Sequence, residues 1–132
     1  MNQRNALLKG IMQGNTERGI LDVWDRQASR EGAVISYMRH EYIDRFNGIC
    51  GRLYRTISGG TEELELEYKS NVFRPEDFEK PCGEEACEQY YRKLKETSDY
   101  DIRTGSTHAG VNRDEILIKI NGVSAKDYGS QG

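Results

Sequence analysis

The feature that most constrains the fold is a stripe of residues that continues from about Ile20 to Ser58 without a proline. Its members recur at spacings of three and four residues, which is the period of one helix face. They are Leu21, Trp24, Ala28, Glu31, Ile35, Met38, Tyr42, Phe46, Ile49, Leu53 and Ile57. A helix of this length would extend roughly 57 Å at 1.5 Å per residue. Because a compact domain of 132 residues cannot cover such a helix, we expect a partner along its length.

The remaining patterns predict an α+β fold with a small antiparallel sheet. The apolar spacing changes from helical to alternating after Gly59-Gly60, and Asn121-Gly122 is the strongest short signal for a hairpin turn. The expected elements are helices at about 3–13, 20–58 and 84–97, a strand at about 62–69 and a β-hairpin at about 115–128. We expect the first, shorter helix to pack antiparallel on the long one as a coiled-coil-like arm. The expected domains are this arm over 1–60 and the sheet with its helix over 61–132.

Composition limits the class of protein. Apolar residues make up 36% of the chain and charged residues 31%, and the formal net charge is −3. A net negative charge argues against the strong positive field of a general nucleic-acid binder, although local basic patches remain possible. The sequence contains no apolar run of the ~20 residues that a membrane-spanning helix needs. The N-terminus also lacks the apolar core of a secretory signal, so we expect a cytoplasmic protein with reduced thiols.

The residues that could carry catalysis or bind metal do not form a recognisable site. A zinc site usually needs four ligands in closely spaced pairs, whereas Cys82, Cys87 and His108 are three residues with wider spacing. The only further candidate ligands, Cys50 and His40, lie on the expected long helix. We therefore expect no metal site. The sequence also has no glycine-rich phosphate loop followed by Lys and Ser or Thr, so it carries no Walker A motif. No catalytic residue is assigned.

Two groups of charged residues are candidates for binding. Arg52, Arg55 and Lys69 could form a basic patch near the end of the long helix, and Arg4 with Lys9 could form another. The run Arg113-Asp114-Glu115 stands where a loop enters the hairpin. Three charges at such a junction can hold a switch or a ligand, or can equally form a surface salt-bridge cluster.

Several short motifs follow one another in the order found in one protein family. In the last third these are Gly110-Val111-Asn112-Arg113-Asp114-Glu115, an alternating strand, Ile120-Asn121-Gly122 and Tyr128-Gly129-Ser130-Gln131-Gly132. Upstream they are Gln3-Arg4-Asn5-x-Leu7-Leu8-Lys9, Leu21-Asp22-Val23-Trp24 and the strand Leu64-Glu65-Leu66-Glu67-Tyr68. In this order they resemble the RecF recombination-mediator family over nearly the whole chain. Val111 and Asn112 depart from the family pattern, which favours proline and histidine there.

The resemblance implies a nucleotide-dependent role for the parent protein. Ser130, Gln131 and Gly132 resemble the opening of the ABC-type signature motif, whose serine and backbone amides face the γ-phosphate of ATP held by the other subunit. The family's Walker A loop would precede Met1, and its Walker B strand would follow Gly132. The chain would then be an arm plus a partial ATPase head, not catalytic alone. The parent would bind ATP and Mg²⁺ and act as a weak ATPase that serves as a switch.

The same resemblance implies partners and a cellular process. The parent would bind single- and double-stranded DNA, form a homodimer on ATP binding, and work with RecR- and RecO-like mediators. Its processes would be DNA replication, recombinational repair and the SOS response. A stand-alone coiled-coil adaptor would explain the stripe over 20–58 equally well, but not the Ser-Gln-Gly ending. A small thiol or metal enzyme would require Cys82, Cys87 and His108 to converge.

Overall fold

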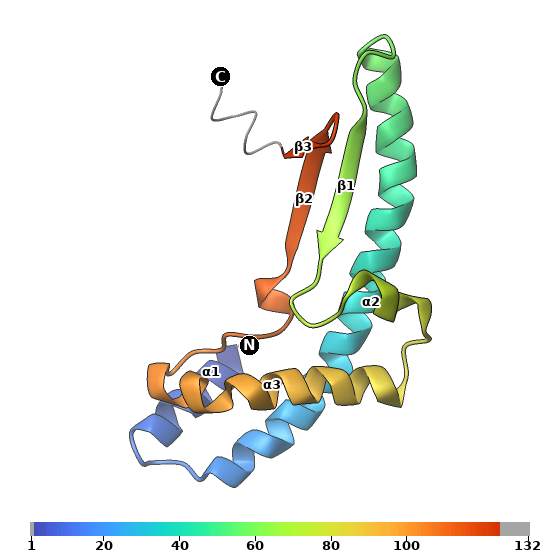
Figure 1. The fold of residues 1–132 in the computed structure, drawn as a ribbon. Helices are drawn as coiled ribbons and strands as arrows, with labels where there is room; N and C mark the ends of the chain where they lie inside the picture. Colours follow the sequence, from blue (N-terminus) through green and yellow to red (C-terminus); the bar gives the residue numbers. More distant parts are fainter. Residues whose placement is uncertain (1, 125–132) are drawn as a thin grey trace. The chain divides into compact units, whose positions relative to one another are not determined.

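The structure is a computed structural model that describes residues 2–124 (Figure 1). Its helices are α1 (Asn2–Met12), α2 (Arg18–Ile57) and α3 (Glu84–Thr104), with short 3₁₀ turns η1 (Pro75–Glu79) and η2 (Val111–Arg113). Its strands are β1 (Leu64–Lys69), β2 (Glu115–Ile120) and β3 (Val123–Ser124). The expected α+β class, the long proline-free helix and the small antiparallel sheet are confirmed. Helix α3 extends seven residues beyond the expected end at 97, to its C-cap at Gly105 in the left-handed conformation.

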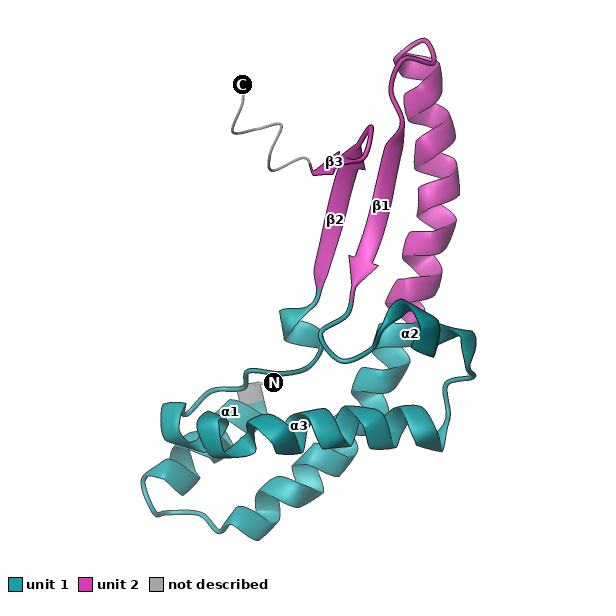
Figure 2. Cartoon of the chain, in the orientation of Figure 1, with its two compact units in different colours: residues 1–37, 70–114 teal, residues 38–69, 115–132 magenta. Residues whose placement is uncertain are grey.

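The chain divides into two compact units (Figure 2). Unit 1 comprises residues 1–37 and 70–114, and unit 2 comprises residues 38–69 and 115–132. Each unit therefore combines segments from both sides of the boundary that we expected at residue 60. The difference arises because α2 contributes its first half to one unit and its second half to the other. A boundary drawn from local sequence patterns cannot detect a helix that is shared in this way.

Unit 1 is built where α3 crosses the first half of α2. The core consists of Ala33 on α2, Ala86, Tyr90 and Leu94 on α3, and Phe73 and Ala109 in the connecting loops. Tyr37 and Phe78 extend it, because both rings lie edge-on or tilted against Phe73 with centroids 5.6 Å away. Such edge-to-face contacts add to the stabilisation that comes from burial alone.

The face of α2 that unit 1 buries coincides with the stripe read from the sequence only at Leu21 and, half-buried, at Ala28. The buried residues of α2 are Leu21, Asp25, Ser29, Gly32, Ala33 and Ser36, mostly small or polar. Trp24 and Ile35, both members of the stripe, are each 38% exposed. Small side chains allow close approach of α3, and the hydroxyls of Ser29 and Ser36 are satisfied by the carbonyls of Asp25 and Gly32 one turn earlier. Close helix packing, rather than apolar content, therefore selects this face.

Unit 2 contains the antiparallel sheet in the order β1-β2-β3, with the second half of α2 beside the outer edge of β1 (Figure 1). Leu66 pairs with Ile118 in the β1–β2 register, and its N–H points outward to the Asn47 side chain of α2 at 2.8 Å. The helix thus covers an edge that would otherwise offer free backbone groups. The expected hairpin turn is confirmed, because Asn121 and Gly122 both have positive φ, 52° and 81°. The part of the expected hairpin beyond Ser124 lies outside the described residues.

Candidate nucleic-acid interface

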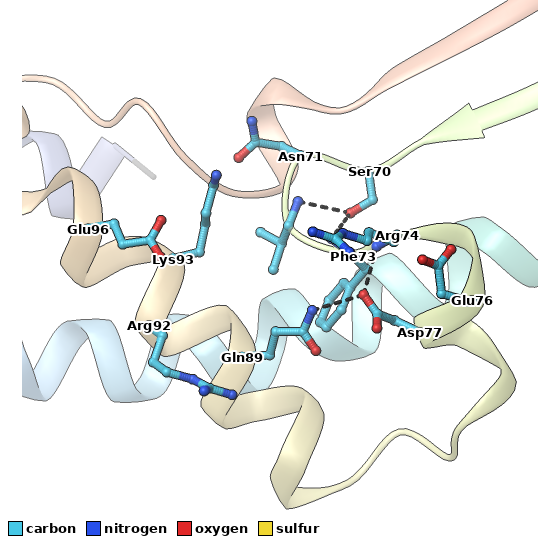
Figure 3. Close-up of a pocket in the computed structure, with 11 residues that line it drawn as sticks. Ser70, Asn71, Phe73, Arg74, Glu76, Asp77, Gln89, Arg92, Lys93 and Glu96 are labelled. Atoms are coloured by element: carbon cyan, nitrogen blue, oxygen red, sulfur yellow. Dashed lines mark hydrogen bonds between the residues drawn. The ribbon is translucent and has the colours of Figure 1, made fainter.

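One cavity of unit 1 lies between α3 and the loop that follows β1 (Figure 3). It has a volume of about 660 Å³ and is lined by polar side chains from both segments. The loop is held in shape locally, because Ser70 Oγ accepts hydrogen bonds from the backbone N–H groups of Val72 and Phe73. Asp77 accepts two more, from the Arg74 backbone N–H and from Gln89 Nε2 of α3. The loop that forms this wall of the cavity is therefore held in one conformation by hydrogen bonds.

Three cations and three carboxylates line this cavity. The cations are Arg74 from the loop and Arg92 and Lys93 from α3, and the carboxylates are Glu76, Asp77 and Glu96. Guanidinium and ammonium groups are the usual donors to phosphate oxygens. The equal number of carboxylates removes the net positive field that would attract a polyanion from a distance. The cavity is suited to hydrogen bonding with a polar group, and its charge alone does not select an anion.

The environment of the Asp77 carboxyl predicts how the stability of the chain changes at low pH. The hydrogen bond from the Arg74 N–H, and then that from Gln89, hold the pKa of Asp77 below its ordinary value of 3.8. A carboxyl with a lowered pKa in the folded state adds stability above its unfolded pKa and loses it as the pH falls through the folded pKa. We therefore expect the free energy of unfolding of the unsubstituted chain, measured with urea, to decrease below about pH 4. In D77N the part of this decrease that comes from Asp77 should be missing. Equal pH slopes for the two proteins would contradict the assignment.

Arg4, predicted from the sequence to contact DNA, is instead buried in unit 1. It is 3% exposed, and its guanidinium donates to Asp25 Oδ1 at 2.7 Å and to Asp101 Oδ2 at 3.0 Å. A third bond goes to the Thr107 hydroxyl at 2.9 Å. Both carboxylates are fully buried, so Arg4 neutralises charge inside the protein and is not available to a phosphate. We correct the expectation accordingly.

The other predicted basic residues are on the surface, Lys9 in unit 1 and the other three in unit 2. Lys9 is exposed on α1 in unit 1. Lys69 is exposed at the end of β1, opposite Glu115 in the register. Arg52 and Arg55 lie together on α2 and line a second cavity, of about 390 Å³, within unit 2. Within unit 2, the structure therefore brings Arg52 and Arg55 together at one cavity.

The cavity beside Arg52 and Arg55 is formed by the end of α2 and the sheet. Asn47 and Gly51 line it from α2, and Asn121 lines it from the hairpin turn. Asn121 is fixed there, because its side chain accepts the Glu63 N–H and its backbone N–H donates to the Glu63 carbonyl. Arg52 Nε donates to the Gly48 carbonyl at 3.2 Å, which leaves the remaining N–H groups of its guanidinium for other acceptors. Acidic residues also line the cavity, namely Asp44, Glu63 and Glu65.

The run Arg113-Asp114-Glu115 holds loops together in unit 1. Arg113 Nη2 donates to the Thr107 carbonyl at 3.0 Å, and Asp114 Oδ1 accepts the Asn71 N–H at 2.9 Å. Glu115 is exposed and begins β2. The contacts of the first two residues are those of structural side chains, and a switch function for the run stays a prediction.

The thiols and His108 do not converge on a metal-binding group. Among residues 2–124, no three His, Cys, Asp or Glu side chains are placed to hold a metal ion. His108 Nδ1 lies 2.8 Å from Asp101 Oδ1 instead. Desolvation, and then the nearby Cys87, raise the pKa of the Cys82 thiol, which lowers its thiolate fraction. The described part of the chain also has no helix that is long and apolar enough to cross a membrane.

Sequence reasoning missed the unit 1 cavity, and it could not test the signature motif. Arg74 and Arg92 are separated by 17 residues and belong to no motif, so the only available signal was the adjacent pair Arg92-Lys93 on the exposed side of a helix. Ser130, Gln131 and Gly132, the predicted nucleotide contacts, lie outside the described residues. Their role stays a prediction.

Comparison with known proteins gives a consistent result over the whole chain. No protein-family model matches the sequence. The chain is 36% identical over 133 residues to the DNA replication and repair protein RecF of Halothermothrix orenii, and 33% identical over 133 residues to that of Desulforamulus reducens. Each alignment covers 100% of this chain and 35% of the relative. Over its whole length the chain matches a segment of RecF-family proteins.

Solved RecF structures share the fold. Two, both described as the recombination mediator protein RecF in the RecFOR pathway, match with TM-scores of 0.84 and 0.82. Each is 28% identical to this chain, and the match covers 99% of it and 34% of the solved chain. The α+β architecture described above is therefore that of a RecF segment. The chain spans about 35% of the length of the RecF relatives it matches.

Proposed function

We propose that this chain is part of a RecF-like protein of DNA replication and recombinational repair, and that it contributes to DNA binding. The observation that supports this most is the match over the whole chain to proteins named for DNA replication and repair, at 33–36% identity. The fold supports it independently, with a TM-score of 0.84 to a RecF structure. The SOS response and a cytoplasmic location belong to the same proposal.

The nucleotide-dependent part of the proposal concerns the parent protein. One of the RecF structures named above is described as RecF-ATP. We infer that the parent binds ATP and Mg²⁺, forms a homodimer on ATP binding and acts as a weak ATPase that serves as a switch. Ser130, Gln131 and Gly132 would contact the nucleotide of the other subunit. This chain alone would then bind DNA without responding to ATP. RecR- and RecO-like mediators would be partners of the parent.

For this chain we place the DNA-contact surface at Arg52 and Arg55, with Lys69 and Lys9 as further candidates. Arg52 and Arg55 line one cavity next to the polar Asn47 and Asn121 side chains. Three carboxylates also line it, so the proposed contact rests on hydrogen bonds from the two guanidinium groups and not on a net positive field. Such neighbours are typical of phosphate contacts, which come from Arg and Lys together with Asn and backbone groups. These contacts position nucleic acid and carry no sequence specificity, so we expect binding that depends little on base sequence.

A salt titration tests this function. Fluorescence anisotropy with labelled single- and double-stranded DNA should show binding by the chain that weakens as salt rises and is unchanged by ATP and Mg²⁺. The variant R52E/R55E should bind at least about 10-fold more weakly, with a salt slope lower by about one per lost phosphate contact. R30E and R30E/R103E provide matched charge reversals at exposed residues of unit 1. Absence of binding at low salt, or equal loss in the control variants, would contradict the proposed surface.

A protein-interaction module is the second candidate function, and one observation favours it. The second half of α2 exposes a row of large apolar side chains that the described residues do not cover. Exposed apolar patches of this size usually mark a surface where another protein binds. An adaptor without a DNA role would show the interaction but no salt-dependent DNA binding, so the same titration separates the two functions.

A further inference from the structure

Cys82 and Cys87 lie on either side of the point where α3 begins. The helix starts at Glu84, and its N-cap is Gly83 in the extended conformation. The backbone N–H of Cys87 donates to the Gly83 carbonyl at 3.1 Å, which is the first hydrogen bond of the helix. Cys82 is therefore the residue just before the N-cap, and Cys87 is the fourth residue of the helix.

These two positions are the ones that meet in a hydrophobic staple. In this motif the side chain before the N-cap packs against the fourth helical residue and fixes the direction in which the chain enters the helix. In this chain both positions hold cysteine, whose thiol packs as a small hydrophobic group and can also form a covalent bond. The staple therefore places two free thiols against each other at the start of α3.

Two properties of the thiols agree with this contact. Desolvation, and then the charge of Cys87, raise the pKa of Cys82, and the second cause requires the two sulfur atoms to be near each other. Cys87 also packs against the core of unit 1, which contains its neighbour Ala86 and Tyr90 one turn further along α3. The Cys82 thiol thus has a partner that packing holds in place.

Both thiols are open to a small oxidant. Cys82 is exposed at the end of the loop that precedes α3. Cys87 is half-buried, and it lines another cavity of unit 1, of about 430 Å³, together with Ser29 and Arg30. Accessible thiols react, whereas fully buried structural ones are inert. Oxidation therefore begins at Cys82, the more exposed of the two.

We propose that Cys82 and Cys87 form a reversible disulfide site that responds to a low-molecular-weight disulfide such as oxidised glutathione. The Cys82 thiolate attacks one sulfur of oxidised glutathione and expels one glutathione thiolate. The Cys87 thiolate then attacks the Cys82 sulfur of the mixed disulfide and expels the second. Two protein thiols become one disulfide, one molecule of oxidised glutathione becomes two of reduced glutathione, and these take up the two protons.

The new bond would restrain one wall of the cavity that Arg74 and Arg92 line. The loop that ends at Cys82 carries Arg74 and Asp77, and α3 carries Arg92. A bond from Cys82 to Cys87 would tie this loop covalently to the first turn of the helix. The site would thus couple the redox state of its surroundings to the mobility of the loop, independently of the proposed DNA role.

Mass spectrometry of the intact chain tests the site. A C50S background leaves only the two thiols of the pair. In excess oxidised glutathione, we expect the main species to be about 2 Da lighter than the reduced chain and to return to the original mass with dithiothreitol. C50S/C87S keeps only Cys82, so it should instead accumulate a glutathione adduct about 305 Da heavier. Two free thiols, a stable adduct in the C50S chain or a disulfide between two molecules would overturn the proposal.

A displaced cysteine tests the staple geometry. The variant C50S/C87S/E88C keeps Cys82 and moves the second thiol one residue along α3, which turns it about 100° around the helix. Glu88 is exposed, so the new thiol is accessible. With samples quenched by iodoacetamide at intervals, the displaced pair should close at least about 10-fold more slowly than the C50S pair, because a disulfide needs a narrow range of side-chain directions. Equal rates would show that nearness in sequence is sufficient and would overturn the staple assignment.

Discussion

Replacing Arg4 with methionine should lower the free energy of unfolding by about 3–5 kcal/mol. The guanidinium of Arg4 balances two fully buried carboxylates, Asp25 and Asp101. Removing it leaves these charges without their principal partner, because the Lys95 ammonium is 3.8 Å from Asp25 and partly exposed. The cost of an uncompensated buried charge exceeds the gain from burying a methionine side chain. Urea denaturation followed by the fluorescence of Trp24, the single tryptophan and a residue of unit 1, measures the change.

Lys9→Met is the matched control for Arg4→Met. It removes one positive charge from the same helix, but Lys9 is exposed. We expect a change within about 0.5 kcal/mol, as for most surface substitutions. The combination of Arg4→Met with Asp25→Asn should cost less than the sum of the single changes, because the two residues share one ion pair. A loss below about 1 kcal/mol in Arg4→Met would show that the buried ion pairs contribute little to folding.

The local parts of the fold could be predicted from the sequence. The period of apolar residues indicated α2 and β1, and Asn121-Gly122 indicated the hairpin turn, because each signal lies within a few neighbouring residues. The resemblance to RecF was likewise visible in short motifs, and the comparisons confirm it. In each case the information needed was contiguous in the chain.

The tertiary environment of single residues could not be predicted. Arg4 and Lys9 look alike in the sequence, yet the partners of Arg4 are 21 and 97 residues away, at Asp25 and Asp101. The cavity lined by Arg74 and Arg92 depends in the same way on a loop that packs against α3. Pattern reasoning assigned the basic residues to the surface because most of them lie there. Only the fold identifies the exception.

The buried side of α2 could not be predicted for a related reason. Apolar periodicity selected the row that contains Ile35 and Phe46, but the residues that pack against α3 are small. Hydrophobicity indicates which side chains gain from leaving water, whereas the distance between two helices is set by side-chain size at their crossing. The apolar row on the second half of α2 is then left exposed among the described residues.

Gly32→Ala tests this close packing and should lower the free energy of unfolding by about 1–3 kcal/mol. A Cβ atom at Gly32 would lie 2.6 Å from the Tyr90 hydroxyl oxygen and against two carbons of its ring. Tyr90 is fully buried, and its hydroxyl accepts the Val111 N–H at 2.9 Å, so the ring cannot move away without losing packing and a hydrogen bond. Overpacking should therefore outweigh the helix propensity of alanine, which by itself favours the variant by about 1 kcal/mol.

Gly48→Ala makes the same chemical change in the same helix without the clash. Apart from the backbone of its own helix turn, no heavy atom of the described residues lies within 4 Å of the Cβ position at Gly48. Here only the backbone effect remains, so we expect a gain of about 0.5–1 kcal/mol, measured by urea denaturation with far-UV circular dichroism. The two substitutions should thus change stability in opposite directions. A gain in both would mean that Tyr90 can shift at little cost, and that α3 does not depend on a glycine at its crossing with α2.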